Sequence, residues 1–235
     1  MSSIKDNIAE INRRIEAAAV KSGRTREDVT FIVVSKTIDV PRIKEAVEAG
    51  EINLGENKVQ EIMDKYEYMG DGVKWHLIGH LQTNKVKYII DKVELIHSVD
   101  SVKLAEEISK RAVQKGIDAR ILLEINIAGE ESKFGLKPED TEHVVREIAK
   151  LSNISIKGLM TVAPFVENSE ENRIYFRRMK ELLVDINSKN IDNVNMDTLS
   201  MGMTGDYEVA VEEGATMVRI GTGVFGPRLY PEKIN

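Results

Sequence analysis

The feature that most constrains the fold is a regular alternation between short apolar segments and longer amphipathic segments. Eight short segments have the composition of buried strands, and a helix-like segment follows each of the first seven. This alternation predicts a parallel sheet with right-handed crossovers. Eight units fit an α/β fold made of one closed (β/α)8 barrel of the TIM type, and an open doubly wound sheet is the alternative. The predicted strands are Thr30–Lys36, Ile52–Leu54, Lys74–Ile78, Glu94–Ser98, Ala119–Ile127, Ile154–Thr161, Met196–Met201 and Met217–Gly221, and the predicted helices are Pro41–Ala49, Lys58–Tyr68, Thr83–Asp91, Ser101–Lys115, Pro138–Leu151, Glu170–Ser188 and Asp206–Glu213.

The first thirty residues add one more helix in front of this pattern. Ile4, Ile8, Ile11 and Ile15 are spaced by four, three and four residues, which places them on one face of an amphipathic helix. We expect this N-terminal helix, within residues 1–29, to pack on the barrel. No linker rich in glycine, proline or serine divides the chain, so we expect one domain over residues 1–235.

Composition excludes several classes of function. The 235 residues carry a formal net charge of −6, which argues against binding to a nucleic-acid backbone because such binding needs a basic surface. The chain has no cysteine, so disulfides and thiolate chemistry are excluded. Its first residues lack the apolar core of a signal peptide, and no apolar run is long enough to span a bilayer. We therefore expect a cytoplasmic protein with no nucleic-acid or membrane partner.

The stretch Phe31–Thr37 holds the first candidate functional residue. Four apolar residues run directly into Ser35 and Lys36, so the lysine would lie at the carboxyl end of a buried strand, where α/β folds place their chemistry. Desolvation at such a place lowers the pKa of an amine and makes the amine a nucleophile toward aldehydes. Lys36 is therefore a candidate for a Schiff base, and the alternative is a solvated residue that simply follows the strand.

A glycine-rich turn near the other end of the chain predicts an anion site. The segment Arg219–Gly226 leads from the eighth predicted strand into Gly221 and Thr222, where small residues let backbone N–H groups approach a phosphate. The hydroxyl of Ser200, after the seventh predicted strand, can add a donor. Loops after strands seven and eight are a frequent phosphate site in barrels of this type.

Arg219 lies between two apolar residues of a strand that should be buried. It would either pair with an acid such as Asp197 or Glu124 inside the barrel or donate hydrogen bonds to a ligand at the barrel mouth. A lysine for an aldehyde, a loop for a phosphate and an arginine for a ring nitrogen together suit pyridoxal 5′-phosphate (PLP). Because arginine does not readily release a proton, the pyridine nitrogen would stay unprotonated and the ring would be a weaker electron sink.

Seven short motifs in the chain are consistent with this ligand. They are Val34–Thr37, Gly55–Glu61, Trp75–Lys85, His97–Asp100, Gly158–Thr161, Leu199–Met203 and Arg219–Gly223. Together they closely resemble the motifs of the pyridoxal phosphate homeostasis proteins, a small PLP-binding family that is similar to the N-terminal barrel of alanine racemase. The resemblance covers essentially the whole chain. One position departs from the family pattern, since Thr204 stands where a serine is more usual, and the hydroxyl is kept.

The resemblance implies a PLP-carrying barrel without established catalytic turnover, which helps to keep the intracellular pool of free PLP in balance. It also implies that PLP-dependent apo-enzymes are candidate partners, and we expect a monomer. Carried over by position, the implied PLP-binding residues are Lys36 as the Schiff-base lysine, Ser200, Gly221 and Thr222 at the phosphate, Arg219 at the pyridine nitrogen, and Asn57 and His80 lining the pocket near the lysine.

Two other functions remain open. A PLP-dependent amino-acid racemase of low activity would need a second acid or base on the opposite face of its substrate, and His80 or one of the six tyrosines could take that role. A Schiff-base aldolase acting on a phosphorylated sugar would use the same lysine and loop but has no need of Arg219. His76 and His80 are four residues apart on a predicted strand end, where side chains do not converge as on a helix, so we expect no metal site.

Overall fold

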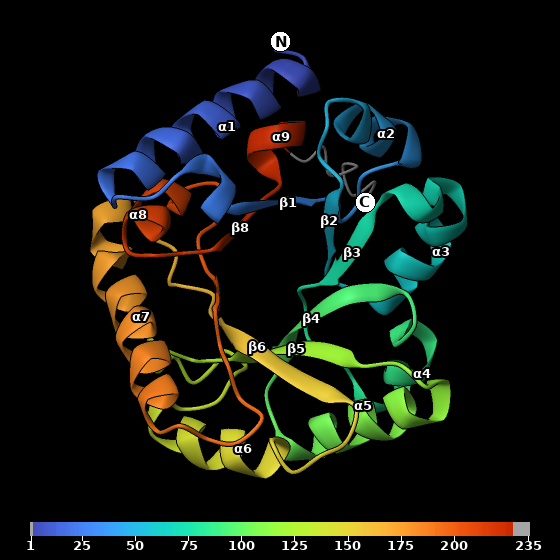
Figure 1. Ribbon diagram of the computed structural model, residues 1–235. Coiled ribbons are helices and arrows are strands. Elements are labelled where there is room, and N and C mark those ends of the chain that lie inside the picture. Colours follow the sequence, from blue (N-terminus) through green and yellow to red (C-terminus); the bar gives the residue numbers. More distant parts are fainter. Residues whose placement is uncertain (1, 228–235) are drawn as a thin grey trace, which may run out of the picture.

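The computed structural model describes residues 2–227, and these residues form a closed barrel of eight parallel strands in sequential order, with helices around the outside (Figure 1). The barrel closes between the first and last strands, where Thr30 is in register with Met217 and Val33 with Ile220. The predicted (β/α)8 barrel is therefore confirmed. The strands are β1 (Thr30–Val34), β2 (Asn53–Glu56), β3 (Lys74–Leu77), β4 (Val93–Val99), β5 (Ala119–Glu124), β6 (Ile154–Met160), β7 (Thr198–Ser200) and β8 (Met217–Ile220).

The strands are buried on both faces, as their near-continuous apolar composition predicts. On β1, Phe31 and Val33 belong to the large apolar cluster between the strands and the helices. Ile32 alternates with them and is in register with Arg219 on β8, so both of these side chains face the barrel interior. The inward-facing side chains of β1 and β8, including the candidate ligand residue Arg219, thus lie on the same side of the sheet.

The N-terminal helix α1 (Ile4–Lys21) packs on the barrel as expected. Ile4, Ile8, Ile11 and Ile15 are all buried, and Ile15 has no exposed surface. Full burial of one such side chain stabilises the fold by about 1.5–3 kcal/mol. A capping box at Ser3 starts the helix, and helices α8 and α9 lie beside it (Figure 1).

Seven of the other helices follow the predicted segments, with differences at their ends, and a short helix at Thr222–Phe225 was not among the predicted ones. Ser101 caps its helix through a hydrogen bond from Leu104, and Gly116 ends that helix in the left-handed conformation. The predicted helix Thr83–Asp91 is instead a 3-10 turn followed by a single α-helical turn, since threonine and asparagine at its start are weak helix formers. The helices are α2 (Val40–Glu48), α3 (Val59–Met69), α4 (Val86–Ile89), α5 (Val102–Lys115), α6 (Thr141–Ile148), α7 (Arg173–Ser188), α8 (Tyr207–Glu212) and α9 (Thr222–Phe225).

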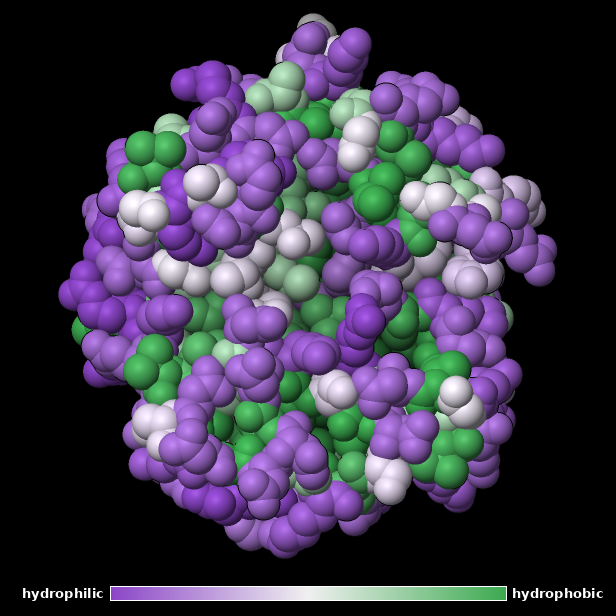
Figure 2. All heavy atoms as spheres, in the orientation of Figure 1, coloured by the Kyte–Doolittle hydropathy of each residue, from purple (hydrophilic) through white to green (hydrophobic). Residues whose placement is uncertain are grey.

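Six of the eight strands end earlier than predicted, and the two largest differences shape the functional end of the barrel. The strand predicted over Thr30–Lys36 stops at Val34, which leaves Lys36 in a turn. The strand predicted over Ala119–Ile127 stops at Glu124. Seen in the orientation of Figure 1, the outer rim of the molecule is mostly hydrophilic, and hydrophobic residues come into view toward the middle (Figure 2). No helix within residues 2–227 is long and apolar enough to cross a membrane.

Candidate functional site

A cavity of about 560 Å³ opens at the carboxyl ends of the strands, within the size range of small-molecule sites. It brings together five of the seven predicted site residues. Lys36 and Asn57 come from the segments that follow β1 and β2, and Arg219, Gly221 and Thr222 come from β8 and the turn after it. Residues that are 185 positions apart in sequence thus line one cavity, because β1 and β8 are hydrogen-bonded neighbours.

The turn after β8 packs closely against β1, and the small residue Gly221 makes this possible. A Cβ added to Gly221 would lie 3.1 Å from the carbonyl oxygen of Val34, so a larger residue would press on β1. Thr222 begins α9, and the first N–H groups of a helix have no partner within the helix. The N–H of Gly223 donates to the hydroxyl of Thr204 over 3.4 Å, which ties the loop after β7 to this turn. Gly221, Thr222 and Thr204 all line the cavity, so small residues and two hydroxyl-bearing side chains meet there, which suits a phosphate.

Arg219 is buried at the base of the cavity with a side chain that is held at two points. Its Nη1 donates to the Ser200 hydroxyl over 2.6 Å, and its Nη2 donates to the carbonyl oxygen of Thr161 over 2.8 Å. Burial lowers the pKa of Arg219 to about 10, while Glu124 and Asp206 oppose this shift. The guanidinium therefore stays charged at neutral pH. The direct ion pair with Asp197 or Glu124 is not formed, because Arg219 uses a hydroxyl and a carbonyl as acceptors instead.

A chain of hydrogen bonds continues from Arg219 across the barrel interior. Ser200 Oγ lies 2.9 Å from His97 Nδ1, His97 Nε2 lies 3.0 Å from His76 Nδ1, and His76 Nε2 lies 3.2 Å from Asn53 Oδ1. Burial lowers the pKa of His76 to about 3 and that of His97 well below its usual value, so both rings are neutral. Since Asn53 Oδ1 only accepts, His76 carries its proton on Nε2, and His97 must then do the same. Ser200 consequently donates to His97 while it accepts from Arg219.

The side chain of Ser200 belongs to this hydrogen-bond chain and not to the cavity lining. The sequence predicts its hydroxyl at the phosphate, but the side chain is fully buried, points into the barrel and does not line the cavity. The physical reason is that its oxygen is already used by Arg219 and His97. Thr204, four residues later, does line the cavity and offers a hydroxyl from the same loop.

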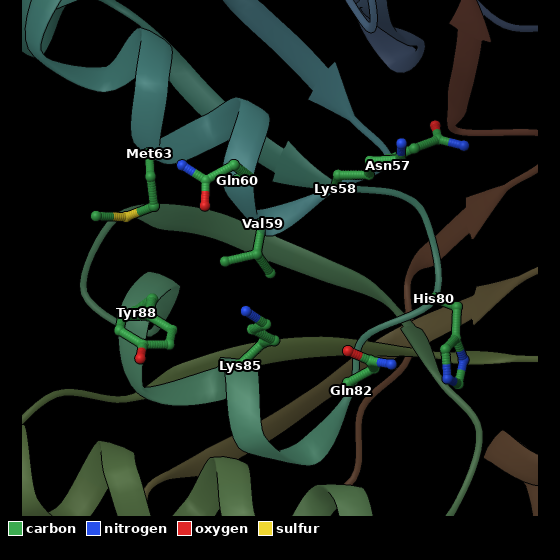
Figure 3. Close-up of a pocket in the computed structure, with 9 residues that line it drawn as sticks. All are labelled: Asn57, Lys58, Val59, Gln60, Met63, His80, Gln82, Lys85 and Tyr88. Carbon is green, nitrogen blue, oxygen red and sulfur yellow. The ribbon is translucent and has the colours of Figure 1, made fainter.

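His80 also lies elsewhere than expected. It lines a neighbouring pocket of about 650 Å³, shown in Figure 3, which shares Asn57 with the main cavity. Its ring stacks on Phe134, with ring centroids 4.1 Å apart, and its Nδ1 lies 3.4 Å from a carboxylate oxygen of Asp100. Lys85 points into this second pocket from the turn before α4 (Figure 3). His80 therefore lies beside the Lys36 cavity and not in its lining.

A carboxyl group lies in a smaller cavity that adjoins the main one. Glu124, at the end of β5, lines a smaller cavity of about 200 Å³ that shares Lys133 and Val162 with the main one. Burial raises the pKa of Glu124 to about 7, Asp100 adds to this effect and Arg219 opposes it. Its Oε2 has no hydrogen-bond partner within the part of the chain that the structure describes. Glu124 can therefore exchange a proton near neutral pH.

Two residues that sequence reasoning did not single out shape the cavity wall. Asp206 accepts a hydrogen bond from the backbone of Met203 over 2.7 Å and another from the amide of Asn172 over 2.8 Å. Asn172 also donates to the carbonyl oxygen of Pro164 over 3.0 Å, which ties the loop after β6 to the loop after β7. Both side chains are buried. Asp206 could have been identified from the sequence, because an aspartate can accept a hydrogen bond from the backbone N–H three residues before it, but no local pattern marks Asn172.

Within residues 2–227, no group of three or more histidine, aspartate or glutamate side chains could hold a metal ion. His76 bonds to His97 and Asn53, whereas His80 Nδ1 lies 3.4 Å from a carboxylate oxygen of Asp100, so the two histidines have different neighbours.

The fold and this cavity define a class of protein. The family model described as the alanine racemase N-terminal domain matches residues 2–229, which identifies a barrel of that type. Within that class, the chain belongs to the pyridoxal phosphate homeostasis protein family. The protein of that name from Aquifex aeolicus is 44% identical over 226 residues, which cover 96% of this chain and 98% of the relative. The one from Pseudomonas aeruginosa is 38% identical over 231 residues, which cover 98% of each.

Solved structures agree with this placement. An unknown protein from Bifidobacterium adolescentis superposes with a TM-score of 0.88 at 37% identity, and the match covers 94% of each chain. PipY of Synechococcus elongatus, in a structure with PLP bound, has a TM-score of 0.83 at 30% identity, over 95% of this chain and all of PipY. Alanine racemase of Clostridium difficile has a TM-score of 0.72 at 19% identity over 58% of its own length, which shows a shared fold. The family predicted from the seven motifs is confirmed.

Proposed function

We propose that this chain binds PLP and holds it through a Schiff base on Lys36, as part of intracellular PLP homeostasis. The observation that carries the proposal is that Lys36, Arg219 and the Gly221–Thr222 turn line one cavity of suitable size. PLP has an aldehyde, a ring nitrogen and a phosphate, and each group has a matching partner there. The relatives named pyridoxal phosphate homeostasis proteins and the PLP-bound PipY support the same ligand.

Each residue would contribute one interaction. The Lys36 amine would add to the aldehyde carbon of PLP, form a C=N bond and release the carbonyl oxygen as water. The turn at Gly221 and Thr222, with the hydroxyl of Thr204, would hold the phosphate. Arg219 would donate a hydrogen bond to the ring nitrogen and, because it keeps its proton, would leave that nitrogen unprotonated. An unprotonated ring nitrogen makes the ring a weaker electron sink, which disfavours reactions that need charge to be delocalised into the ring.

A low-activity amino-acid racemase is the second candidate function. Racemisation needs a second acid or base besides the lysine, on the other face of the substrate. Glu124 is a candidate, since burial raises its pKa to about 7 and its small cavity adjoins the main one. Alanine racemisation that is lost in Glu124→Gln would support this function. A wild-type rate below roughly 1 per second would speak for the carrier.

The visible spectrum of the protein tests the carrier proposal. We expect a yellow protein after incubation with PLP, and we expect the colour to be absent in Lys36→Ala. Lys58→Ala is a matched control, because Lys58 lines the neighbouring pocket, and it should keep the colour. A colourless wild type, or a Lys36→Ala variant as yellow as the wild type, would refute the proposal. Delivery of PLP to apo-enzymes, a monomeric state and a cytoplasmic location are further parts of the proposal.

A further inference from the structure

A buried cluster of charges lies directly behind the segment that carries Lys36. The Lys65 ammonium, on α3, donates to Glu56 Oε1 over 2.8 Å and to Glu61 Oε2 over 3.3 Å. Glu56, at the end of β2, has no exposed surface, and Lys65 is nearly as well buried. None of these three side chains lines the cavity. The cluster therefore does not contact the ligand directly, and its effect on the site must pass through the residues that it holds.

The cluster holds the residues on both sides of Lys36. Lys65 Nζ donates to the carbonyl oxygen of Ser35 over 2.9 Å, and the Ser35 hydroxyl donates to Glu56 Oε1 over 2.7 Å. On the other side, Glu61 Oε2 accepts the backbone N–H of Thr37 over 2.7 Å. The turn that presents Lys36 is thus fixed immediately before and immediately after the lysine.

The backbone of this turn is strained. The N–H of Ile38 donates to the carbonyl oxygen of Ser35 over 3.0 Å, so Lys36 and Thr37 are the two central residues of a turn. Thr37 has a φ of 65°, which glycine usually adopts at this place and which is unfavourable for a β-branched residue. Such a conformation persists only where the surroundings enforce it. Thr37 is exposed, so side-chain packing does not enforce this conformation, and two hydrogen bonds hold it: the one that closes the turn and the one from the Thr37 N–H to Glu61.

We propose that Glu56, Glu61 and Lys65 are positioning residues that hold the Lys36 turn and thereby set how fast Lys36 reacts with an aldehyde. This inference rests on the proposed Schiff base. The reacting atoms must lie close together and be aligned, and a displacement of about 1 Å can slow a reaction on the order of 100-fold. The phosphate turn and Arg219 are held by other residues, so non-covalent binding does not depend on the cluster.

Two ligands separate these effects. PLP reports both binding and imine formation, whereas pyridoxine 5′-phosphate has a hydroxymethyl group in place of the aldehyde and reports binding alone. In Lys65→Met and Glu61→Ala, we expect the absorbance change on mixing with PLP to be roughly 10- to 100-fold slower. The affinity for pyridoxine 5′-phosphate should stay within about twofold of wild type, since the phosphate and ring contacts remain.

Two further variants sharpen the test. Glu61→Gln keeps an oxygen that can accept the Thr37 N–H, so it should restore a rate near that of wild type. Asp64→Asn changes a charge on the same helix, where Asp64 accepts a hydrogen bond from Gln60, and it should leave the reaction with PLP and the affinity for pyridoxine 5′-phosphate unchanged. Should Lys65→Met fail to fold, Glu61→Ala decides the question, because Glu61 is partly exposed and outside the barrel wall.

Three outcomes would overturn the inference: wild-type rates in Glu61→Ala, a parallel loss of affinity for both ligands, or no rescue by Glu61→Gln. Failure of the proposed function looks different, because the wild type itself would then form no imine. In that case the inference falls with it.

Discussion

Replacing Glu56 by glutamine should change how the stability of the fold depends on pH. Burial raises the pKa of Glu56 from 4.5 to about 7, although Lys65 and Ser35 oppose the shift through hydrogen bonds. A raised pKa means that the folded protein binds the proton more tightly than the unfolded chain does. The carboxyl therefore stabilises the fold fully below pH 4.5, and this contribution is lost as the pH rises toward 7.

The size of the effect follows from that shift. A rise in pKa from 4.5 to about 7 corresponds to roughly 3 kcal/mol in the free energy of unfolding. Glutamine does not titrate, so the free energy of unfolding of Glu56→Gln minus that of wild type should grow by this amount between pH 4 and pH 8. Any constant offset from the altered hydrogen bonds cancels in the pH dependence.

Urea unfolding at a series of pH values measures this difference. Trp75 is the only tryptophan, it is buried on β3, and its fluorescence reports unfolding directly. Glu142→Gln removes an exposed carboxyl on α6 and is the control, which should follow the wild-type pH profile. If Glu56→Gln and wild type lost stability in parallel over this range, the raised pKa of Glu56 and the reasoning from its burial would be refuted.

Three further predictions concern other parts of the barrel. Gly79→Ala would place a Cβ 2.4 Å from the carbonyl oxygen of Asn57, so the segment after β2 must move. The affinity for PLP, measured by titration at fixed protein concentration, should therefore fall on the order of tenfold. Unchanged affinity would show that Asn57 does not position the ligand. Ile15→Ala should lower the free energy of unfolding by about 2–5 kcal/mol, whereas the exposed Val20→Ala should change it by less than about 0.5 kcal/mol. Nitrogen NMR should show His76 and His97 neutral and protonated on Nε2 from pH 5 to 8, and a titration of either ring in this range would contradict the hydrogen-bond chain.

Local sequence pattern was enough to predict the barrel. Strand and helix periodicities differ, and each strand carries its own apolar run, so the order of elements could be read without knowledge of the contacts. The position of Lys36 at a strand end and of the glycine-rich turn after the last strand followed from the same pattern. The strand ends were harder, because the turn at Lys36 depends on a hydrogen bond from Thr37 to Glu61, 24 residues away.

Side-chain direction at the strand ends could not be predicted in the same way. Ser200 is the last residue of β7, and a shift of one residue decides whether its hydroxyl faces the barrel interior or the helices outside the barrel. Its partner His97 is 103 residues away, so no local signal marks that bond. The ring of His80 stacks on Phe134, and the sequence does not predict this contact. Lys65 has the sequence context of an ordinary surface lysine, and only the folded structure shows its bond to Glu56.

The covalent link to one lysine can be measured directly. Borohydride reduction of the PLP-treated protein converts an imine into a stable amine, and peptide mass spectrometry then locates the added mass. Lys36 and Lys133 both line the cavity, so the experiment distinguishes two amines at the same site. We predict the added mass on Lys36. Modification confined to Lys133, or no modification at either lysine, would contradict the assignment of Lys36 as the residue that carries PLP.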